Sequence, residues 1–171
     1  MENQYLHEVV ITAIIIKDKK YLVTKRSATK KRFPNMWTVP GGKLESKDYL
    51  ELPKDTKDYW YNVLERTLRR EVKEEVGLDV KLAGEVRSFK DGSIALLAPR
   101  FMNRHYVDNT HEHIVLIYFA TVETDQIQEG VVREMSDEIR WFTKEDIEDP
   151  RYELRDNIKY YAEEALKELG K

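Results

Sequence analysis

Three glutamates close together in the second quarter of the chain are the residues best suited to chemistry. Glu71, Glu74 and Glu75 are spaced three and four residues apart, which brings side chains to one side of a helix. Their like charges repel one another at neutral pH, and a divalent cation would relieve that repulsion. Mg²⁺ in particular prefers oxygen ligands. A Glu-rich helix face that stands alone is usually just solvated, so the surrounding residues decide between the two interpretations.

The neighbours of these glutamates favour the metal site. An arginine, Arg70, comes directly before the first Glu, Gly77 follows the last after one residue, and a Gly-Gly turn lies upstream at Gly41 and Gly42. With ordinary residue usage, the pattern Arg-Glu-x-x-Glu-Glu-x-Gly arises by chance in about one chain of this length in several thousand. The run Arg70–Leu78 is therefore a specific signal.

The run resembles the signature of the Nudix hydrolase family: Gly, five residues, Glu, seven residues, Arg-Glu, an apolar residue, any residue, Glu-Glu, any residue, Gly and an apolar residue. Arg70–Leu78 matches the second half at every fixed position, and Trp37–Glu45 resembles the strand and Gly-Gly turn that open the motif. The resemblance implies an α+β fold, an α/β/α sandwich with a mixed β-sheet, the motif's loop and helix, and a C-terminal helix. It also implies that residues 1–171 form a single domain.

The first half of the motif departs from the family pattern. Counting back eight residues from Arg70 places Asn62 where the family has its first Glu, and Gly42 to Asn62 is 20 positions where the signature has 6. These counts predict an enlarged loop at about 46–59. By resemblance, the missing Glu orients the arginine, and we expect Glu45, Glu51 or Glu65 to supply that contact instead.

The resemblance implies hydrolysis of a nucleoside diphosphate linked to another group, by water and with a divalent metal, Mg²⁺ or alternatively Mn²⁺. It implies Glu71 and Glu75 as the first metal ligands, then Glu74, with the carbonyl of Gly42 as a backbone ligand. Arg70 is expected to orient the glutamates through charge-assisted hydrogen bonds.

A general base is also expected among the catalytic residues. Glu71 and Glu74 are candidates within the motif, but many family members take this residue from a distant loop. Glu138 is then the leading candidate, followed by Glu134 and Glu129. The alternative for Glu138 is an ordinary exposed residue before a strand.

Substrate contacts are predicted in three places. Arg26 belongs to a basic loop, Lys25–Arg32, that suits phosphate binding, and the alternative is a solvated loop. Trp37 is either a stacking surface for a base or a core residue. Arg100 opens the segment Arg100–Tyr106, which mixes cations with aromatic rings and suits either a base or sugar pocket or the contact of a homodimer.

Two histidines have a spacing that metal sites also use. His111 and His113 alternate along one face of an expected strand. No carboxylate is expected on that face, so we interpret them as histidines at a strand edge.

The elements that would position these residues follow from hydrophobic periodicity. A hairpin is expected over Glu8–Arg26, and its first run, Val9–Ile16, is apolar on both faces and so belongs inside a sheet covered on both sides. An apolar residue at every fourth position predicts a helix over Lys57–Val76. Strands are also expected at Val80–Phe89, His113–Val122 and Ile139–Phe142. A strand or a long loop is expected over Asp91–Asn109, and an amphipathic helix over Tyr152–Leu169.

Composition excludes several classes of protein. The 171 residues carry a formal net charge of −3, which argues against binding duplex nucleic acid through bulk charge. Cys is absent, which excludes disulfides and thiolate chemistry, including isomerases of prenyl diphosphates that need a Cys. The longest apolar run, Val9–Ile16, is too short to span a bilayer. We therefore expect no membrane partner and a cytoplasmic location.

Three functions remain from different classes. The first is hydrolysis of a nucleoside triphosphate or modified nucleotide, and the second is hydrolysis of ADP-ribose or a nucleotide sugar. The third is a catalytically silent ligand-binding module, which is disfavoured because all three helix glutamates are present.

The enlarged loop is predicted to act as a lid over the substrate. Deleting residues 47–54 should then change the affinity for a nucleotide, measured by calorimetry, while the far-UV circular dichroism spectrum stays unchanged. An unchanged affinity would count against the lid.

Overall fold

The computed structural model describes residues 6–31, 33–85, 98–127 and 136–170. The strands are β1 (Leu6–Lys17), β2 (Lys20–Arg26), β3 (Trp37–Thr38), β4 (Gly41–Lys43), β5 (Val80–Leu82), β6 (Phe101–Asp108), β7 (His111–Val122) and β8 (Ser136–Phe142). The helices are η1 (Ser46–Asp48), α1 (Val63–Val76), α2 (Lys144–Glu148), η2 (Pro150–Tyr152) and α3 (Asp156–Leu169).

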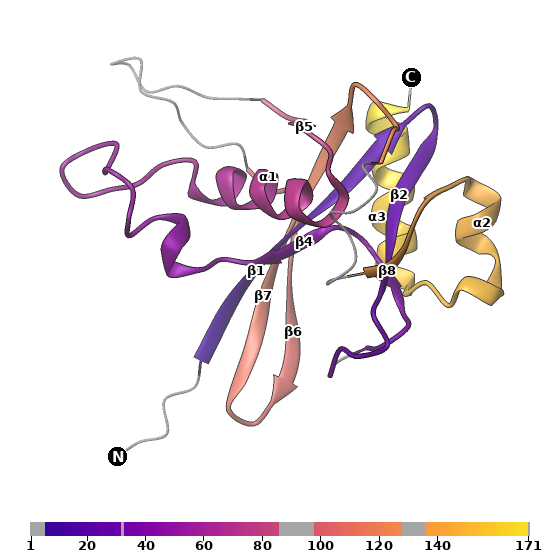
Figure 1. Ribbon diagram of the computed structural model, residues 1–171, viewed down its shortest axis with the longest axis horizontal. Coiled ribbons are helices and arrows are strands. Elements are labelled where there is room, and N and C mark those ends of the chain that lie inside the picture. Colours follow the sequence, from indigo (N-terminus) through magenta and orange to yellow (C-terminus); the bar gives the residue numbers. More distant parts are fainter. Residues whose placement is uncertain (1–5, 32, 86–97, 128–135, 171) are drawn as a thin grey trace.

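The sheet is mixed, with β1 and β7 at its centre (Figure 1). These two strands run parallel in a continuous register from Leu6↔His111 to Ile16↔Thr121. β5 and β6 pair antiparallel with β7, and on the other side β1 pairs antiparallel with β2 and β4. β3 and β8 pair with β2.

The expected hairpin forms, but its strands separate soon after the turn. Asp18 and Lys19 adopt positive φ of 48° and 59°, as the tightest hairpin turns require. β1 and β2 pair only beside that turn, at Ile16↔Tyr21 and Lys17↔Lys20. Beyond it, β4 pairs with β1 while β3 pairs with β2. The separation therefore places the Gly-Gly turn between the two strands of the hairpin.

Both faces of the sheet are covered by helices, as the apolar run predicts. Ile11, Ala13 and Ile15 of β1 pack in a buried cluster with the apolar stripe of α1. Ile14 and Ile16 pack in a second cluster with α3. Alternate side chains of a strand point to opposite faces, so β1 contributes to both clusters. The α/β/α sandwich is confirmed.

The predicted helix over Lys57–Val76 is wrong at its start. α1 begins at Val63, after Asn62 with a left-handed φ of 56°. The preceding residues form a loop with its own contacts: Trp60 Nε1 donates to the Leu52 carbonyl at 3.0 Å, and Tyr61 N donates to the Asp55 carboxylate at 2.6 Å. Trp60 therefore fits the apolar repeat of the helix but belongs to the loop before it.

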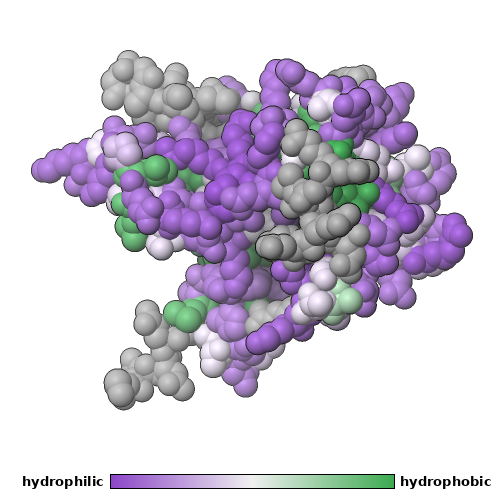
Figure 2. Space-filling model, in the orientation of Figure 1, coloured by the Kyte–Doolittle hydropathy of each residue, from purple (hydrophilic) through white to green (hydrophobic). Residues whose placement is uncertain are grey.

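The loop projects from the body of the molecule, and Figure 2 shows hydrophobic side chains on it. Leu50 and Leu52 are both exposed there.

Other element boundaries also differ from the expectations. The strand expected over Val80–Phe89 is present as β5, Val80–Leu82, and residues 86–89 lie outside the described residues. Within 91–109, the described part contains a strand, β6. The C-terminal helix begins at Asp156 rather than Tyr152, which belongs to η2. None of the helices in the described ranges is long and apolar enough to cross a membrane.

The packing of α1 predicts the effect of a core truncation. Leu68 is 0% exposed, so Leu68→Ala should lower the free energy of unfolding by about 3 kcal/mol. Leu50, on the projecting loop, is 61% exposed, so the matched Leu50→Ala should change it by less than about 0.5 kcal/mol. Urea denaturation measures both, and equal effects would contradict this packing of α1.

Candidate active site

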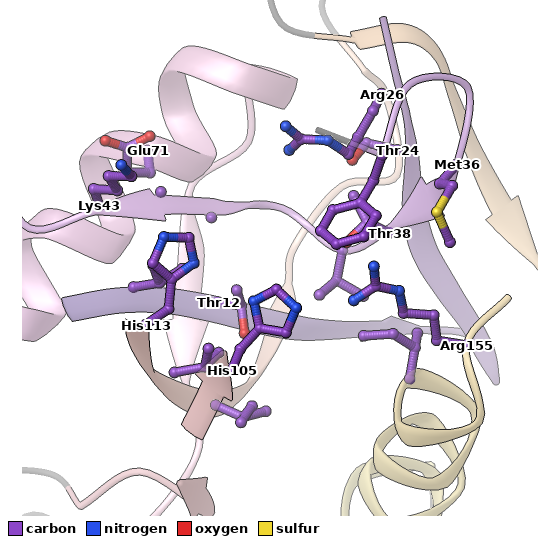
Figure 3. Close-up of a pocket in the computed structure, with 18 of the residues that line it drawn as sticks. Thr12, Thr24, Arg26, Met36, Thr38, Lys43, Glu71, His105, His113 and Arg155 are labelled. Atoms are coloured by element: carbon purple, nitrogen blue, oxygen red, sulfur yellow. The ribbon is translucent and has the colours of Figure 1, made fainter. Parts of the chain in front are cut away.

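A cavity of about 650 Å³ lies where β1 and β2 separate, on the side of the sheet that α3 covers. Figure 3 shows Glu71 and Lys43 on one side of the cavity and Arg26 and Arg155 on the other. The cavity is lined by residues of β1, β2, β4, α1, β6, β7 and α3. It thus collects side chains from distant parts of the sequence.

Glu75 joins the Gly-Gly turn to α1. The residue is 9% exposed, and its carboxylate accepts a hydrogen bond from the Gly41 amide at 2.9 Å. Burial raises the pKa of Glu75 to about 7, and the nearby Glu71 carboxylate acts in the same direction, whereas the Gly41 hydrogen bond opposes the shift. Burial therefore destabilises the ionised form of Glu75, and a nearby cation would stabilise it.

Glu71 lies directly against Gly42. A Cβ atom at Gly42 would come within 2.1 Å of the Glu71 Oε2 atom, so glycine is what lets the turn approach this carboxylate. Glu71 is 7% exposed, and burial raises its pKa while the Arg70 guanidinium opposes the rise. Glu71 and Glu75 both line the cavity.

Glu74 is placed differently from the other two glutamates. Its side chain is 58% exposed and does not line the cavity, and its Oε2 atom accepts a hydrogen bond from Arg70 Nη1 at 2.9 Å. The structure therefore brings two of the three predicted glutamates together at the cavity, with Glu74 beside them on the arginine.

Arg70 is held by an aspartate that the sequence reasoning missed. Its Nε and Nη2 atoms donate to the two carboxylate oxygens of Asp48 at 2.8 and 3.0 Å, and its Nη1 atom lies 2.8 Å from Glu71 Oε1. Burial opposes ionisation of Asp48, but the hydrogen bonds and charge of Arg70 outweigh it and lower the pKa. Hydrogen bonding to Asp48 in turn raises the pKa of Arg70.

Asp48 corrects the expectation for the first half of the motif. It lies six residues after Gly42, which is the position of the first Glu in the signature. Asp48 therefore occupies the position of the motif's first Glu. Asn62 does not correspond to that position and is the residue before α1. The contact to Arg70 that was expected from Glu45, Glu51 or Glu65 is made by Asp48. Counting forward from Gly42, instead of backward from Arg70, would have found Asp48.

The enlarged loop consequently falls after Asp48, between η1 and α1. Residues 46–62 are all described, and none of them lines the cavity, although Glu45 does. A deletion of residues 47–54 would also remove Asp48, so a test of the lid must leave Asp48 in place. The lid itself stays a prediction.

Glu138 lies on β8 between two cations. It accepts a hydrogen bond from Lys25 at 3.0 Å and pairs with Arg140 at 2.5 Å, and these contacts, that of Lys25 first, lower its pKa. It does not line the cavity. Its role as a general base stays a prediction, and Glu129 and Glu134 lie outside the described residues.

The three predicted substrate residues have different surroundings. Arg26 lines the cavity. Trp37 also borders it, but the indole is buried in the core, with ring centroids 4.9 Å from Phe142 and 5.9 Å from Tyr152. Arg100 does not line the cavity and instead forms an ion pair with Glu168.

The segment after Arg100 splits between two faces. Asn103 and His105 of β6 line the cavity, whereas Met102 and Tyr106 are exposed. A nucleotide contact and a homodimer contact would therefore use opposite faces of β6.

The expectation for His111 and His113 needs correction. A carboxylate does lie on their face, because β1 places Glu8 beside them: Glu8 Oε2 is 2.9 Å from His113 Nε2 and 3.8 Å from His111 Nε2. Parallel pairing of strands about 100 residues apart in sequence produces this cluster, and local patterns do not reveal it.

The comparisons with known proteins agree with this fold and motif. The family model described as NUDIX domain matches residues 6–163, and the chain belongs to the Nudix hydrolase family. It is a pyrophosphohydrolase of that type, a family that generally uses divalent metals.

One curated relative and two solved structures illustrate the similarity. A nucleoside triphosphatase, NudI, from Enterobacter sp. (strain 638) is 26% identical over 139 residues, 81% of this chain and 83% of the relative. A NUDIX-family hydrolase from Clostridium perfringens has a TM-score of 0.69 at 24% identity, covering 94% of this chain and 97% of that one. A MutT NUDIX hydrolase from Burkholderia pseudomallei has a TM-score of 0.61 at 20% identity, covering 92% and 97%.

The contacts of Arg70 predict the effect of removing one negative charge. Asp48→Asn keeps the shape of the side chain but leaves the partly buried Arg70 with a weaker partner, so the free energy of unfolding should fall by about 2 kcal/mol. Metal-dependent turnover should fall with it, because Arg70 also contacts Glu71.

Asp55→Asn is the matched control, because Asp55 receives a hydrogen bond within the projecting loop. It should leave turnover unchanged. Urea denaturation and phosphate release measure the two effects, and identical behaviour of both variants would show that Asp48 does not position Arg70.

Proposed function

We propose that the protein is a Mg²⁺-dependent pyrophosphohydrolase of nucleoside triphosphates or modified nucleotides, with Mn²⁺ as the alternative metal. The observation that carries the proposal is the pair of buried carboxylates, Glu71 and Glu75, at the Gly-Gly turn on the wall of a cavity of about 650 Å³. The name of the Enterobacter relative, a nucleoside triphosphatase, supports the choice of substrate class.

The residues at the turn fit a hard divalent cation. Glu71 and Glu75 are carboxylates, and each has a pKa raised by burial, a condition that a nearby cation reverses. We assign both as metal ligands, together with the carbonyl of Gly42. Glu74 is more exposed, and we assign it chiefly as a hydrogen-bond partner of Arg70 and only secondarily as a metal ligand. When bound, the cation supplies positive charge for the diphosphate and helps to activate water.

The protein's own side chains then hold the site in place. Asp48 holds Arg70, and Arg70 holds Glu71, so the carboxylate meets the cation in a fixed orientation. Gly41 holds Glu75 through its amide. Each of the two predicted metal ligands on α1 is therefore held by a contact of its own.

The opposite side of the cavity suits the rest of a nucleotide. Arg26 and Arg155 bring positive charge to it, which favours phosphate oxygens. Arg155 also stacks on Phe33, with its guanidinium carbon 3.8 Å from the ring centroid, and both residues line the cavity. We assign the aromatic ring at this end to the nucleoside and the two arginines to the phosphate attached to it.

ADP-ribose or a nucleotide sugar is the second candidate. The cavity is also lined by Asn103, Asn157 and Tyr161, polar side chains of the kind that bind hydroxyl groups. A silent ligand-binding module is disfavoured, because Asp48 fills the acidic position that seemed lost.

Substitutions of the glutamates separate these assignments. Glu71→Gln and Glu75→Gln should each lower Mg²⁺-dependent turnover by about 100-fold or more, whereas the more exposed Glu74→Gln should lower it by less than about 10-fold. The measurement is release of phosphate or pyrophosphate from nucleoside triphosphates, ADP-ribose and nucleotide sugars, with and without Mg²⁺.

Three outcomes of these measurements would contradict the proposal or favour another function. Undiminished activity of Glu75→Gln would remove the assigned role of that residue. Tight nucleotide binding by the wild type without turnover of any substrate would favour the binding module, and turnover of the sugars alone would favour the second candidate.

A further inference from the structure

A second group of metal-binding side chains lies on the same cavity, apart from the glutamates of α1. Glu8 comes from β1, and His111 and His113 come from β7. In the parallel register Glu8 lies opposite His113, and His111 is two residues earlier on the same face. All three residues line the cavity and are partly buried.

The three ligand atoms are close enough to one another to bind a single small cation. Each offers one ligand atom, and these atoms all lie within 4.8 Å of one another. Two bonds of about 2.0–2.1 Å in tetrahedral geometry separate ligand atoms by about 3.3 Å. The observed 2.9 Å from Glu8 Oε2 to His113 Nε2, and 3.8 Å to His111 Nε2, lie on either side of that separation.

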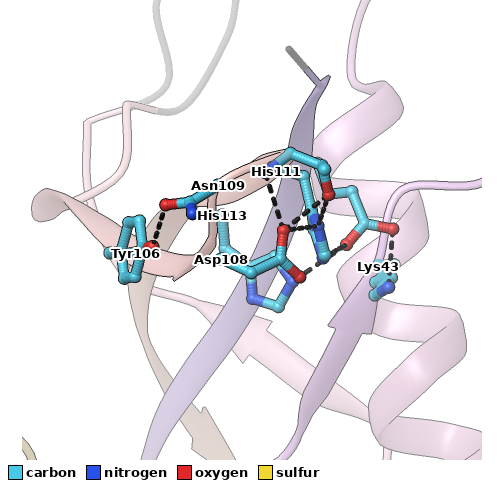
Figure 4. Close-up of polar contacts among 8 residues, drawn as sticks. Lys43, Tyr106, Asp108, Asn109, His111 and His113 are labelled. Carbon is cyan, nitrogen blue, oxygen red and sulfur yellow. Dashed lines mark hydrogen bonds and ion pairs between the residues drawn. The ribbon is translucent and has the colours of Figure 1, made fainter. Parts of the chain in front are cut away.

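Outer partners fix the orientation of two of these side chains (Figure 4). Lys43 lies 2.6 Å from the other oxygen of Glu8, which leaves Oε2 turned toward the histidines. The Asp108 carboxylate accepts a hydrogen bond from His111 Nδ1 at 3.0 Å. A carboxylate on the second nitrogen is the usual partner of a metal-binding histidine, because it fixes the tautomer that leaves Nε2 as the ligand.

We propose that Glu8, His111 and His113 form a second cation site, specific for Zn²⁺ and similar late first-row metals. Two imidazoles and one carboxylate suit such a metal, whereas Mg²⁺ prefers oxygen ligands alone. Three protein ligands leave one tetrahedral position open, and the cavity lies on that side. The open position suits a water molecule or a phosphate oxygen.

Metal binding at this site depends on the tautomer of His113. Without metal, His113 Nε2 lies 2.9 Å from the Glu8 carboxylate, which makes a hydrogen bond with the ring nitrogen. A cation bound to both atoms requires the tautomer with the proton on Nδ1, because Nε2 must then present its lone pair. A protonated imidazole has no lone pair to offer, so binding should weaken at low pH.

Calorimetric titration of Zn²⁺ into the chelator-treated protein, in excess Mg²⁺, tests the proposal. The wild type should bind one Zn²⁺ tightly. His113→Gln and His111→Gln should each weaken binding by about 100-fold or more, and Asp108→Asn by about 10- to 100-fold. These measurements need no substrate, so their failure is separate from failure of the proposed hydrolysis.

Two matched variants distinguish this site from other sites. His7→Gln removes a histidine of the same strand β1 that pairs with a different carboxylate, Glu112, and it should bind Zn²⁺ like the wild type. Glu75→Gln should also retain tight Zn²⁺ binding. Loss of the Zn²⁺ site in Glu75→Gln, or wild-type binding by His113→Gln, would overturn the proposal.

A spectrum of the wild type keeps the proposal testable if the histidine variants do not fold. Co²⁺ in place of Zn²⁺ should give the strong visible absorption of a tetrahedral site with nitrogen ligands. Weak absorption typical of six oxygen ligands would overturn the assignment.

Discussion

The contact between Glu75 and the amide of Gly41 is the constraint on which the site depends. It joins the C-terminal half of α1 to β4, and β4 is itself held by β1. Once this contact is made, Gly42 lies against Glu71, where a Cβ atom would collide with the carboxylate. The two carboxylates and the Gly-Gly turn are thereby brought together, from segments about 30 residues apart in sequence.

That arrangement has an electrostatic cost, and the surrounding residues explain how it is tolerated. Glu71 and Glu75 are buried near each other, and burial raises the pKa of both. Arg70 stabilises Glu71, and Asp48 stabilises Arg70 in turn, whereas the buried Glu75 receives a hydrogen bond from the Gly41 amide. The proposed cation would offset this electrostatic cost.

The sequence predicted most of this where the signal was local. The run of β1 that is apolar on both faces predicted a central strand covered on both sides. The apolar residue at every fourth position predicted the helix that carries Glu71 and Glu75. It predicted less where distant segments meet. The helix was predicted to start too early, because Trp60 lies in a loop at a position that fits the apolar repeat. Periodicity alone does not show where a helix starts. Asp48 was missed because the insertion lies between Asp48 and Arg70, so that the count back from Arg70 ended on Asn62.

The separation of β1 from β2 explains why one cavity receives such different side chains. A hairpin that stayed paired would close the space that β4 enters, and no turn would reach α1. Because the strands separate, the far half of β1 pairs on one side with β4 and on the other with β7. Lys43 of β4 then lies next to Glu8, on the face of β1 that also meets His113. The carboxylates at the turn and the imidazoles of β7 thus line one cavity through a single strand, and the two proposed sites suit different metals because their side chains differ in chemistry.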